Sequence, residues 1–494
     1  MDPIVLIHGY SAESKTSTPA SIAGIYGSFP DDLRKLYGNK GVIEIDLSRY
    51  VSLEDGISVD DISRALDRPL RQQHPHLLMG RFNVVVHSTG ALVIRNWLRR
   101  FSTTPSPVRS ITYLAGANLG SGWAHIGKGQ LAKWARSVFQ GGAERGVQVL
   151  DALELGSSWT IDLHLHFLRD KTRMRAAYDI FEFVIIGSQA DVAWFETPIR
   201  YAKEDGSDGV IRVSASNVNM QYLRLGPTKD ALEIDWNSAS KQLLIDARRK
   251  TKSLDERGDF YEVKEEYRPG SGAMPIVPMA IPFQCAHSGN SMGIVIGKKP
   301  RTQVITLVQK ALSVATNEDW QSALTFFDEV TTSTYRQALE FEKPSSWTPW
   351  IQEPRAQYDK HAQVIFRIRD QDGRPVRHYD VFFDSEANAP AFPIKDLMED
   401  KHVNDVASNV ILFYLRTDHF VEDKWIARLP NLSGVFLEVS ATEPETDQIL
   451  YLPVRYELPT EQLLEWIVPH RTTIIDVELH RIPSDDVFVM ADAS

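Results

Sequence analysis

Three residues in this sequence have the types and the chain order needed for nucleophilic ester chemistry: Ser88, Asp208 and His287. Serine is a weak nucleophile until a histidine accepts its proton, and that histidine needs a carboxylate to hold its tautomer and stabilise the imidazolium. We interpret Ser88 as the nucleophile, His287 as the general base and then acid, and Asp208 as the orienting acid. Asp205 is the rival acid, because it follows the same predicted late strand.

The stretch around Ser88 predicts the sharp turn that such a serine requires. Residues 82–87 form a mostly apolar run typical of a buried strand, and residues 91–101 repeat apolar side chains at helical spacing. Strand, serine, Gly90 and helix follow without a gap, as in a nucleophile elbow, where the glycine lets the helix pass close to the strand. Val86 stands where the usual G-x-S-x-G pattern has its first glycine. An ordinary strand-to-helix connection is the alternative interpretation.

A second motif lies at the start of the chain, where residues 4–7 predict a strand that runs into His8 and Gly9. In α/β-hydrolases a His-Gly pair at this point opens the loop that donates one oxyanion N–H. We therefore expect the backbone N–H groups of Tyr10 and Thr89 to form the oxyanion hole. Each such donor typically contributes on the order of a hundredfold in rate.

The elements that must position these residues read as a parallel sheet. Further apolar segments of strand type lie at residues 42–46, 111–115 and 181–187, and helical segments separate the early strands. This alternation predicts an α/β fold with a mostly parallel sheet flanked by helices, of the α/β-hydrolase type. Ligands bind at the carboxyl edge of such sheets, so the site is expected there.

The chain is long enough for two or three domains, since it has 494 residues. We expect a catalytic domain over residues 1–342, with an insertion at roughly 218–283, then a linker at 343–360. Residues 361–494 contain several short alternating strands with turn signals between them, which favours an all-β, sandwich-like C-terminal domain.

Composition excludes several other classes of protein. The formal net charge of −11 would repel a nucleic-acid backbone, so no nucleic-acid partner is expected. The single cysteine allows no intrachain disulfide and suits a reducing compartment. We find no signal peptide and no apolar run of transmembrane length, so we expect a cytoplasmic protein or one bound peripherally to a membrane.

Two segments suggest contact with lipid, and each also has a purely structural interpretation. Residues 128–139 predict a basic amphipathic helix, which would be a lid or interfacial anchor or else a helix packed on the core with solvated lysines. Residues 274–283, just before His287, carry no charge and three prolines, which exclude a regular helix. That run is either buried covering or an exposed apolar loop able to touch lipid.

Metal chemistry is the competing interpretation of the histidines. The pairs His74/His76 and His164/His166 have no third ligand at a recognisable spacing, and no His-Glu-x-x-His motif occurs. We therefore predict no metal site.

With these residues in place, the chain resembles the bacterial PlaB-type family of phospholipase A and lysophospholipase A enzymes. The matching motifs are His87-Ser88-Thr89-Gly90, residues 114–121 (LAGANLGS), residues 153–157 (LELGS), residues 207–213 (SDGVIRV) and Ala286-His287-Ser288-Gly289. The resemblance spans about residues 1–320 and extends more loosely over the β-rich remainder. The long insertion and the valine at position 86 depart from the family pattern.

This resemblance implies hydrolysis of acyl ester bonds in glycerophospholipids and lysophospholipids by a peripheral membrane enzyme. It places the family's serine, aspartate and histidine on Ser88, Asp208 and His287. It also implies a homo-oligomer, a dimer or tetramer, and NAD as a possible regulatory ligand, whereas catalysis itself needs no cofactor. No glycine-rich dinucleotide loop is evident here, so NAD rests on the resemblance alone.

Three functions therefore stay open at the level of sequence. The first is the phospholipase. The second, with the same chemistry, is a soluble carboxylesterase or thioesterase. The third is a catalytically silent protein that binds lipid or a partner through its β-rich domain.

Overall fold

The computed structural model describes residues 2–9, 21–51, 55–125, 146–190, 204–233, 260–271, 274–340, 355–386, 393–446 and 448–483. The chain divides into two compact units. Unit 1 comprises Met1–Asn219, Pro269–His361 and Phe420–Trp425, and unit 2 comprises Met220–Arg268, Ala362–His419 and Ile426–Ser494.

Unit 1 is built on a parallel sheet of six strands in the order β2-β1-β3-β4-β5-β8. The strands are β1 Ile4–Ile7, β2 Val42–Ile45, β3 Phe82–His87, β4 Val108–Leu114, β5 Phe181–Ile185 and β8 Met279–Ala280. Three of the four strands inside the sheet, β1, β3 and β5, are buried along their whole length, as the apolar runs predicted. The carboxyl ends of these strands therefore meet at one edge, where ligands bind in sheets of this kind.

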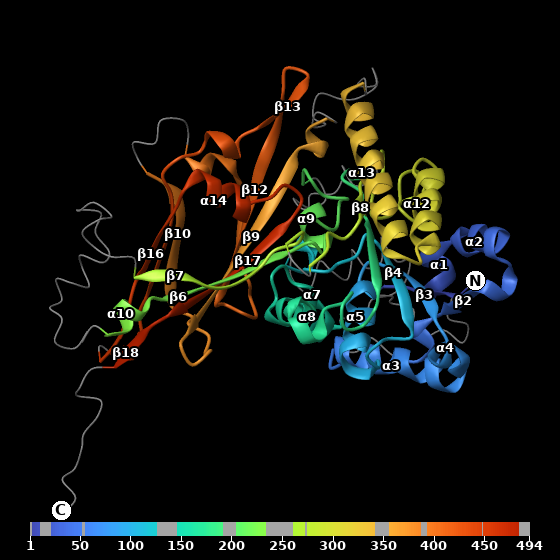
Figure 1. Ribbon diagram of the computed structural model, residues 1–494, viewed down its shortest axis with the longest axis horizontal. Coiled ribbons are helices and arrows are strands. Elements are labelled where there is room, and N and C mark those ends of the chain that lie inside the picture. The colour runs from blue at the N-terminus through green and yellow to red at the C-terminus, as the bar shows by residue number, and fades with distance from the viewer. Residues whose placement is uncertain are drawn as a thin grey trace, which may run out of the picture. The chain divides into compact units, whose positions relative to one another are not determined.

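Helices cover both faces of this sheet (Figure 1). Helices α1, α2, α12 and α13 lie on one side, and α3, α5, α7 and α8 on the other. Their bounds are α1 Ser21–Tyr26, α2 Phe29–Tyr37, α3 Val59–Gln72, α4 Pro75–Met79, α5 Gly90–Phe101, α7 Val147–Leu153, α8 Ser158–Leu168, α9 Val213–Ser216, α12 Arg301–Ser313 and α13 Asn317–Leu339. This arrangement confirms the predicted α/β class with a parallel sheet.

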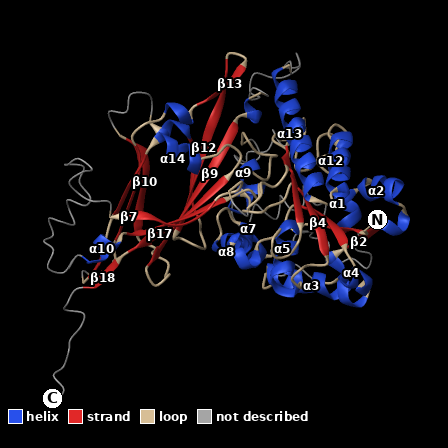
Figure 2. Cartoon of the chain, in the orientation of Figure 1, coloured by secondary structure: helices blue, strands red, loops and turns tan. Residues whose placement is uncertain are grey.

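Unit 2 consists mainly of strands, drawn in red in Figure 2. One mixed sheet has the order β11-β12-β9-β17-β6-β7 with β13 on β12, and a smaller antiparallel sheet has the order β10-β14-β16. The bounds are β6 Gln221–Pro227, β7 Tyr261–Tyr267, β9 Lys360–Asp370, β10 Tyr379–Ser385, β11 Met398–Val403, β12 Val410–Val421, β13 Lys424–Ala427, β14 Val435–Ala441, β15 Ile449–Tyr451, β16 Val454–Leu458, β17 Thr472–Leu479 and β18 Arg481–Pro483. Its described residues also include the short helices α10 Lys229–Glu233 and α14 Thr460–Trp466.

The mixed sheet and the β10-β14-β16 sheet pack face to face around an aromatic cluster, while β15 and β18 form a separate antiparallel pair. The rings of Phe366 on β9 and Phe413 on β12 lie 5.7 Å apart, and Phe383 on β10 lies within 6.0 Å of both. All three side chains belong to one buried apolar core. The predicted β-rich, sandwich-like C-terminal region is therefore present, although its larger sheet is mixed, with β9, β17 and β6 parallel.

The domain boundaries differ from those expected from sequence. We expected residues 218–283 to be an insertion of the catalytic domain, but β6 and β7 belong to unit 2, where β6 pairs with β17 in parallel register. The partners are about 250 residues apart, so no local pattern links them. Most of the expected linker at 343–360 lies outside the described residues, and its last part, from residue 355, clusters with unit 1.

Of the two segments that suggested lipid contact, one lies outside the described residues and the other is described in full. The basic helix expected at residues 128–139 lies outside the described residues. The run 274–283 is partly buried and supplies β8, the edge strand that pairs with β5. Across the described ranges, no helix combines the length and apolar character that crossing a bilayer requires.

Candidate active site

Ser88 sits in a strained turn between β3 and α5. Its φ is +54°, a left-handed conformation that is uncommon for residues other than glycine. Two backbone bonds hold the turn: Ser88 N–H donates to Leu114 O at 3.1 Å, and Ala117 N–H donates to Ser88 O at 3.1 Å. These are the features of a nucleophile elbow, which the sequence predicted at this serine.

Two glycines allow the chain to approach this turn closely. A Cβ on Gly9 would lie 2.8 Å from Thr89 Oγ1 and 2.9 Å from His87 O, so a side chain there would displace the elbow. A Cβ on Gly90 would lie 3.1 Å from the carbonyl oxygens of Ile7 and His8. Glycine is thus needed at position 90 so that the start of α5 can pass beside the end of β1. The segments at Gly9 and Thr89, which are predicted to lead to the oxyanion donors, lie against each other.

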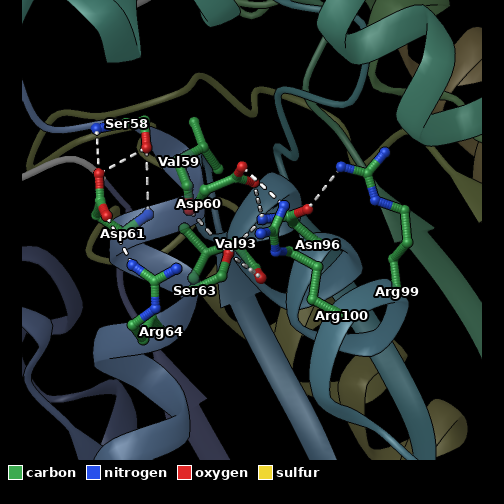
Figure 3. A network of polar contacts seen from close by, with 10 residues as sticks. All are labelled: Ser58, Val59, Asp60, Asp61, Ser63, Arg64, Val93, Asn96, Arg99 and Arg100. Carbon is green, nitrogen blue, oxygen red and sulfur yellow. Dashed lines mark hydrogen bonds and ion pairs between the residues drawn. The ribbon is translucent and has the colours of Figure 1, made fainter.

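Helix α5, which starts at the elbow, is fixed to α3 by a set of polar contacts (Figure 3). Asn96 Nδ2 donates to Asp60 Oδ1 at 2.8 Å and to Ser63 Oγ at 3.0 Å. The Ser63 hydroxyl lies 2.8 Å from the Val59 carbonyl oxygen and 3.2 Å from that of Val93, and Arg100 pairs with Asp60 at 2.8 Å. Because α5 cannot shift freely along α3, the amino end of α5 at Thr89 is held in place.

The predicted acid and base lie in contact. His287 Nδ1 is 2.9 Å from Asp208 Oδ2, and the two side chains are buried. The other carboxylate oxygen, Oδ1, accepts the backbone N–H groups of Val210 at 2.9 Å and Ile211 at 2.7 Å. The loops are also joined through their backbones, because His287 N–H donates to Asp208 O at 2.9 Å. Asp205 is buried as well, but the histidine ring contacts Asp208.

His287, the predicted base, lies beside the turn at Ser88. The ring of His287 is 4.8 Å from that of His87, the residue immediately before Ser88. Within the described part of the chain, His287 Nε2 has no hydrogen-bond partner. With Nδ1 facing the carboxylate, Nε2 is the nitrogen left to accept a proton. No hydrogen bond between Ser88 Oγ and this nitrogen is present among those residues.

Further side chains make contacts with the acid loop, residues 204–212, which carries Asp208. No role was predicted for these side chains from the sequence. Trp123 Nε1 donates to Gly209 O at 2.7 Å, and Ser121 Oγ donates to Val210 O at 2.6 Å. Arg212 forms a buried two-point ion pair with Glu204, at 2.8 and 2.7 Å. Ser121 and Arg212 lie within two of the motifs that carry the family resemblance. Those motifs were the only sequence signal that could have pointed to these two residues. Their contacts hold the segment that presents Asp208.

An apolar pocket adjoins Thr89, whose N–H is a candidate oxyanion donor. With its side chains as they stand it has about 30 Å³ of free space, so it is a narrow crevice and not a cavity of ligand size. It is lined by His8, Gly9, Leu47, Ser48, Val51, Val59, Ile62, Thr89, Leu92, Val93, Val149 and Leu153. The lining is mainly aliphatic, which suits a hydrocarbon chain, and sequence analysis did not predict it. The other candidate oxyanion residue, Tyr10, lies outside the described residues.

Two buried histidines stay neutral. Burial, and secondarily the nearby His287, lowers the pKa of His87 well below its usual range. Burial, and secondarily the charge of Arg95, does the same to the pKa of His164, whose Nε2 lies 2.6 Å from Asn118 O. His164 is therefore a structural group, and a neutral His87 puts no positive charge beside the base.

These two rings predict a loss of stability in mild acid. A histidine whose pKa is lowered in the folded state binds more protons in the unfolded state. Its contribution to the free energy of unfolding is therefore fully present above pH ~6.5 and is lost as the pH falls. We expect the free energy of unfolding to fall between pH 7 and 5, by up to about 1.4 kcal/mol per pH unit for each ring. Denaturant unfolding at several pH values measures this slope. His164→Gln keeps a donor for Asn118 O and should reduce the slope by up to about 1.4 kcal/mol per pH unit; an unchanged slope would contradict the assignment to His164.

No group of three or more His, Cys, Asp or Glu side chains that could hold a metal ion occurs in the described ranges. The rings of His74 and His76 lie 6.0 Å apart on an outer loop and helix. The other sequence pair, His164 and His166, is engaged with Asn118 O and Tyr178 Oη respectively.

A parallel sheet covered by helices, a strained serine at the β3–α5 turn and an Asp-His pair at the same strand edge together define the α/β-hydrolase fold. No protein-family model and no curated protein sequence matches the chain. Among solved structures, phospholipase PlaB from Legionella pneumophila aligns with a TM-score of 0.75 at 22% identity, covering 100% of this chain and 96% of that chain. Its complex with thio-NAD gives 0.75 at 21% identity, covering 100% and 97%. The whole chain therefore has the PlaB-type fold that its motifs predicted.

Proposed function

We propose that this protein is a serine hydrolase that cleaves acyl ester bonds of glycerophospholipids and lysophospholipids at a membrane surface. The observation that carries the proposal is the buried Asp208–His287 pair, 2.9 Å between Oδ2 and Nδ1, beside the strained elbow at Ser88. The fold shared with phospholipase PlaB supports it.

In this proposal Ser88 Oγ attacks the ester carbonyl while His287 Nε2 takes its proton. Asp208 holds Nδ1–H and stabilises the imidazolium, which then protonates the departing alcohol oxygen. The N–H of Thr89, at the positive end of α5, and the N–H of Tyr10 receive the oxyanion charge. Water, activated by His287, then releases the fatty acid from Ser88.

The aliphatic lining of the pocket beside Thr89 favours a hydrocarbon chain over a polar group. Its free space is about 30 Å³, so we propose that these side chains move apart when an acyl chain enters. A soluble carboxylesterase or thioesterase is the second candidate, because the same pocket and the same residues would also serve short acyl groups.

Ligands and assembly enter the proposal from the resemblance. The hydrolysis needs no cofactor, since the nucleophile, base and acid are side chains. NAD is a candidate regulatory ligand because the PlaB structure from Legionella pneumophila was solved with thio-NAD. A homo-oligomer and peripheral membrane contact are proposed on the same resemblance.

The test is fatty-acid release from phosphatidylglycerol vesicles, phosphatidylcholine vesicles and lysophospholipid micelles, beside soluble esters of increasing acyl length. We expect hydrolysis of all three lipids, and we expect kcat/KM on the soluble esters to rise with acyl length. A fluorophosphonate should block hydrolysis of the lipids and of the soluble esters. Hydrolysis of short soluble esters alone would select the esterase. Vesicle binding without any hydrolysis would select the catalytically silent protein.

A further inference from the structure

A short segment of unit 1, Arg355–Asp359, contacts both loops that carry the acid and the base. It contains a single 3-10 turn, Ala356–Tyr358, and the side chains of Gln357, Tyr358 and Asp359 are buried. It lies far from the triad loops in sequence, and no motif marks it. We call this segment the clasp.

The clasp holds the approach to the acid. The carbonyl oxygen of Gln357 accepts the N–H of Gly206 at 3.1 Å and the hydroxyl of Ser188 at 2.8 Å. Gly206 lies two residues before Asp208 and has φ +68°, and Ser188 follows the end of β5. A single carbonyl thus ties the acid loop to the carboxyl edge of the sheet.

The clasp also contacts the base loop, the segment that leads to His287, through the hydroxyl group of Tyr358. Tyr358 Oη accepts the N–H of Gln284 at 3.0 Å and donates to Gln189 Oε1 at 3.0 Å. Gln284 has φ +49° and lies three residues before His287, so the hydroxyl holds the base loop at its strained residue. The Tyr358 ring stacks on Phe283, with centroids 5.9 Å apart. Burial raises the pKa of Tyr358, so the hydroxyl stays a neutral donor.

A third set of contacts holds the clasp itself. Asp359 Oδ1 accepts the N–H of Phe420 at 2.9 Å and Trp425 Nε1–H at 3.1 Å. Both donors belong to the tip of the β12–β13 hairpin, residues Phe420–Trp425, which clusters with unit 1. Tyr335 on α13 packs edge-on against Tyr358 and Trp425. The hairpin tip, the clasp and the two loops are therefore one connected set of contacts.

We propose that Tyr358 is a positioning residue for the Asp208–His287 pair, and that the β12–β13 hairpin tip keeps it in place through Asp359. The inference rests on the proposed hydrolase function. Loss of the Tyr358 hydroxyl leaves the part-buried Gln284 N–H without its acceptor, which favours movement of the base loop away from its strained conformation. A displacement of about 1 Å at a catalytic group can lower the rate by about a hundredfold.

Tyr358→Phe tests this, with Tyr261→Phe as the matched control. Tyr261 is equally buried, at 2% exposure, and its hydroxyl makes a 2.9 Å bond to Leu452 O in unit 2. On a soluble short-chain ester we expect Tyr358→Phe to lower kcat by about ten- to a hundredfold with KM unchanged. Tyr261→Phe should change neither constant. Equal kcat values for the two variants, in an active wild type, would overturn the proposal.

A second readout does not depend on activity. Amide hydrogen exchange in peptides spanning residues 284–289 should be faster in Tyr358→Phe than in wild type or Tyr261→Phe. Unchanged exchange in Tyr358→Phe would overturn the proposed role of Tyr358, whether or not the wild type is active. An inactive wild type would separately refute the proposed hydrolase function. Trp425→Phe, which removes the donor to Asp359 but keeps a ring, should produce the same two effects more weakly. Should Tyr358→Phe fail to fold, this variant decides the question by the same criteria.

Discussion

Ser88→Ala is expected to lower kcat on both vesicles and soluble esters by about four to six orders of magnitude, the usual cost of removing the nucleophile of a triad. The loss comes from chemistry and not from folding. Alanine tolerates the φ of +54° about as well as serine does, and Ser88 Oγ makes no hydrogen bond in the described part of the chain. Thermal unfolding of the variant should therefore match that of wild type.

Ser110→Ala is the control for this experiment. Ser110 is a fully buried serine on β4 whose hydroxyl donates to Asn83 Oδ1 at 2.7 Å. Its loss should cost about 1 kcal/mol of stability and leave kcat unchanged. In addition, a fluorophosphonate should label wild type at the peptide containing Ser88 and leave Ser88→Ala unlabelled. Retained activity in Ser88→Ala, or label on another serine, would show that the elbow is not the nucleophile.

Asp208→Asn is expected to lower kcat by about three to four orders of magnitude, as the corresponding change does in other triads. The asparagine side-chain oxygen would remain at the Oδ1 position, because the N–H groups of Val210 and Ile211 require an acceptor there. Its NH₂ group must then face His287 Nδ1, which forces the proton onto Nε2. In that tautomer the histidine cannot accept the serine proton, although the loop keeps its shape.

Asp205→Asn separates the two candidate acids. It removes a buried carboxylate three residues away in the same loop, so it carries a similar risk of local disturbance. We expect its kcat to stay within about tenfold of wild type, since His287 contacts Asp208. A loss as large as that of Asp208→Asn would show that the acid has been assigned to the wrong residue. Both variants are compared with wild type on the same soluble ester at the same pH.

The local parts of this structure could be predicted because their signals are local. The β3–α5 turn follows from an apolar strand, a serine, a glycine and an amphipathic helix in direct succession. Parallel strands between helices predicted the α/β class, and alternating strands predicted the β-rich region. The prediction that Asp208 and His287 face each other used only chain order and a family resemblance, and the structure brings the two side chains together.

What sequence could not show are the contacts between distant segments. The strands β6 and β17 pair in parallel register, yet charged residues beside β6 indicated an excursion from the catalytic sheet. The apolar pocket draws its lining from segments between residues 8 and 153, each of which reads as ordinary core. Tyr358 reads as one more buried aromatic, because nothing near it in sequence indicates that its hydroxyl reaches Gln284.

By itself, the sequence determined the elements, their class and the types of residue available for chemistry, since hydrophobic periodicity and glycine positions act over a few residues. Only the tertiary structure decided which acid contacts the histidine, which strands complete the second sheet and what holds the catalytic loops. These outcomes depend on backbone hydrogen bonds, such as those of Gly206 with Gln357 and of His287 with Asp208, which satisfy buried polar groups. Almost any residue type supplies the same N–H and C=O, so such bonds leave no mark in the sequence.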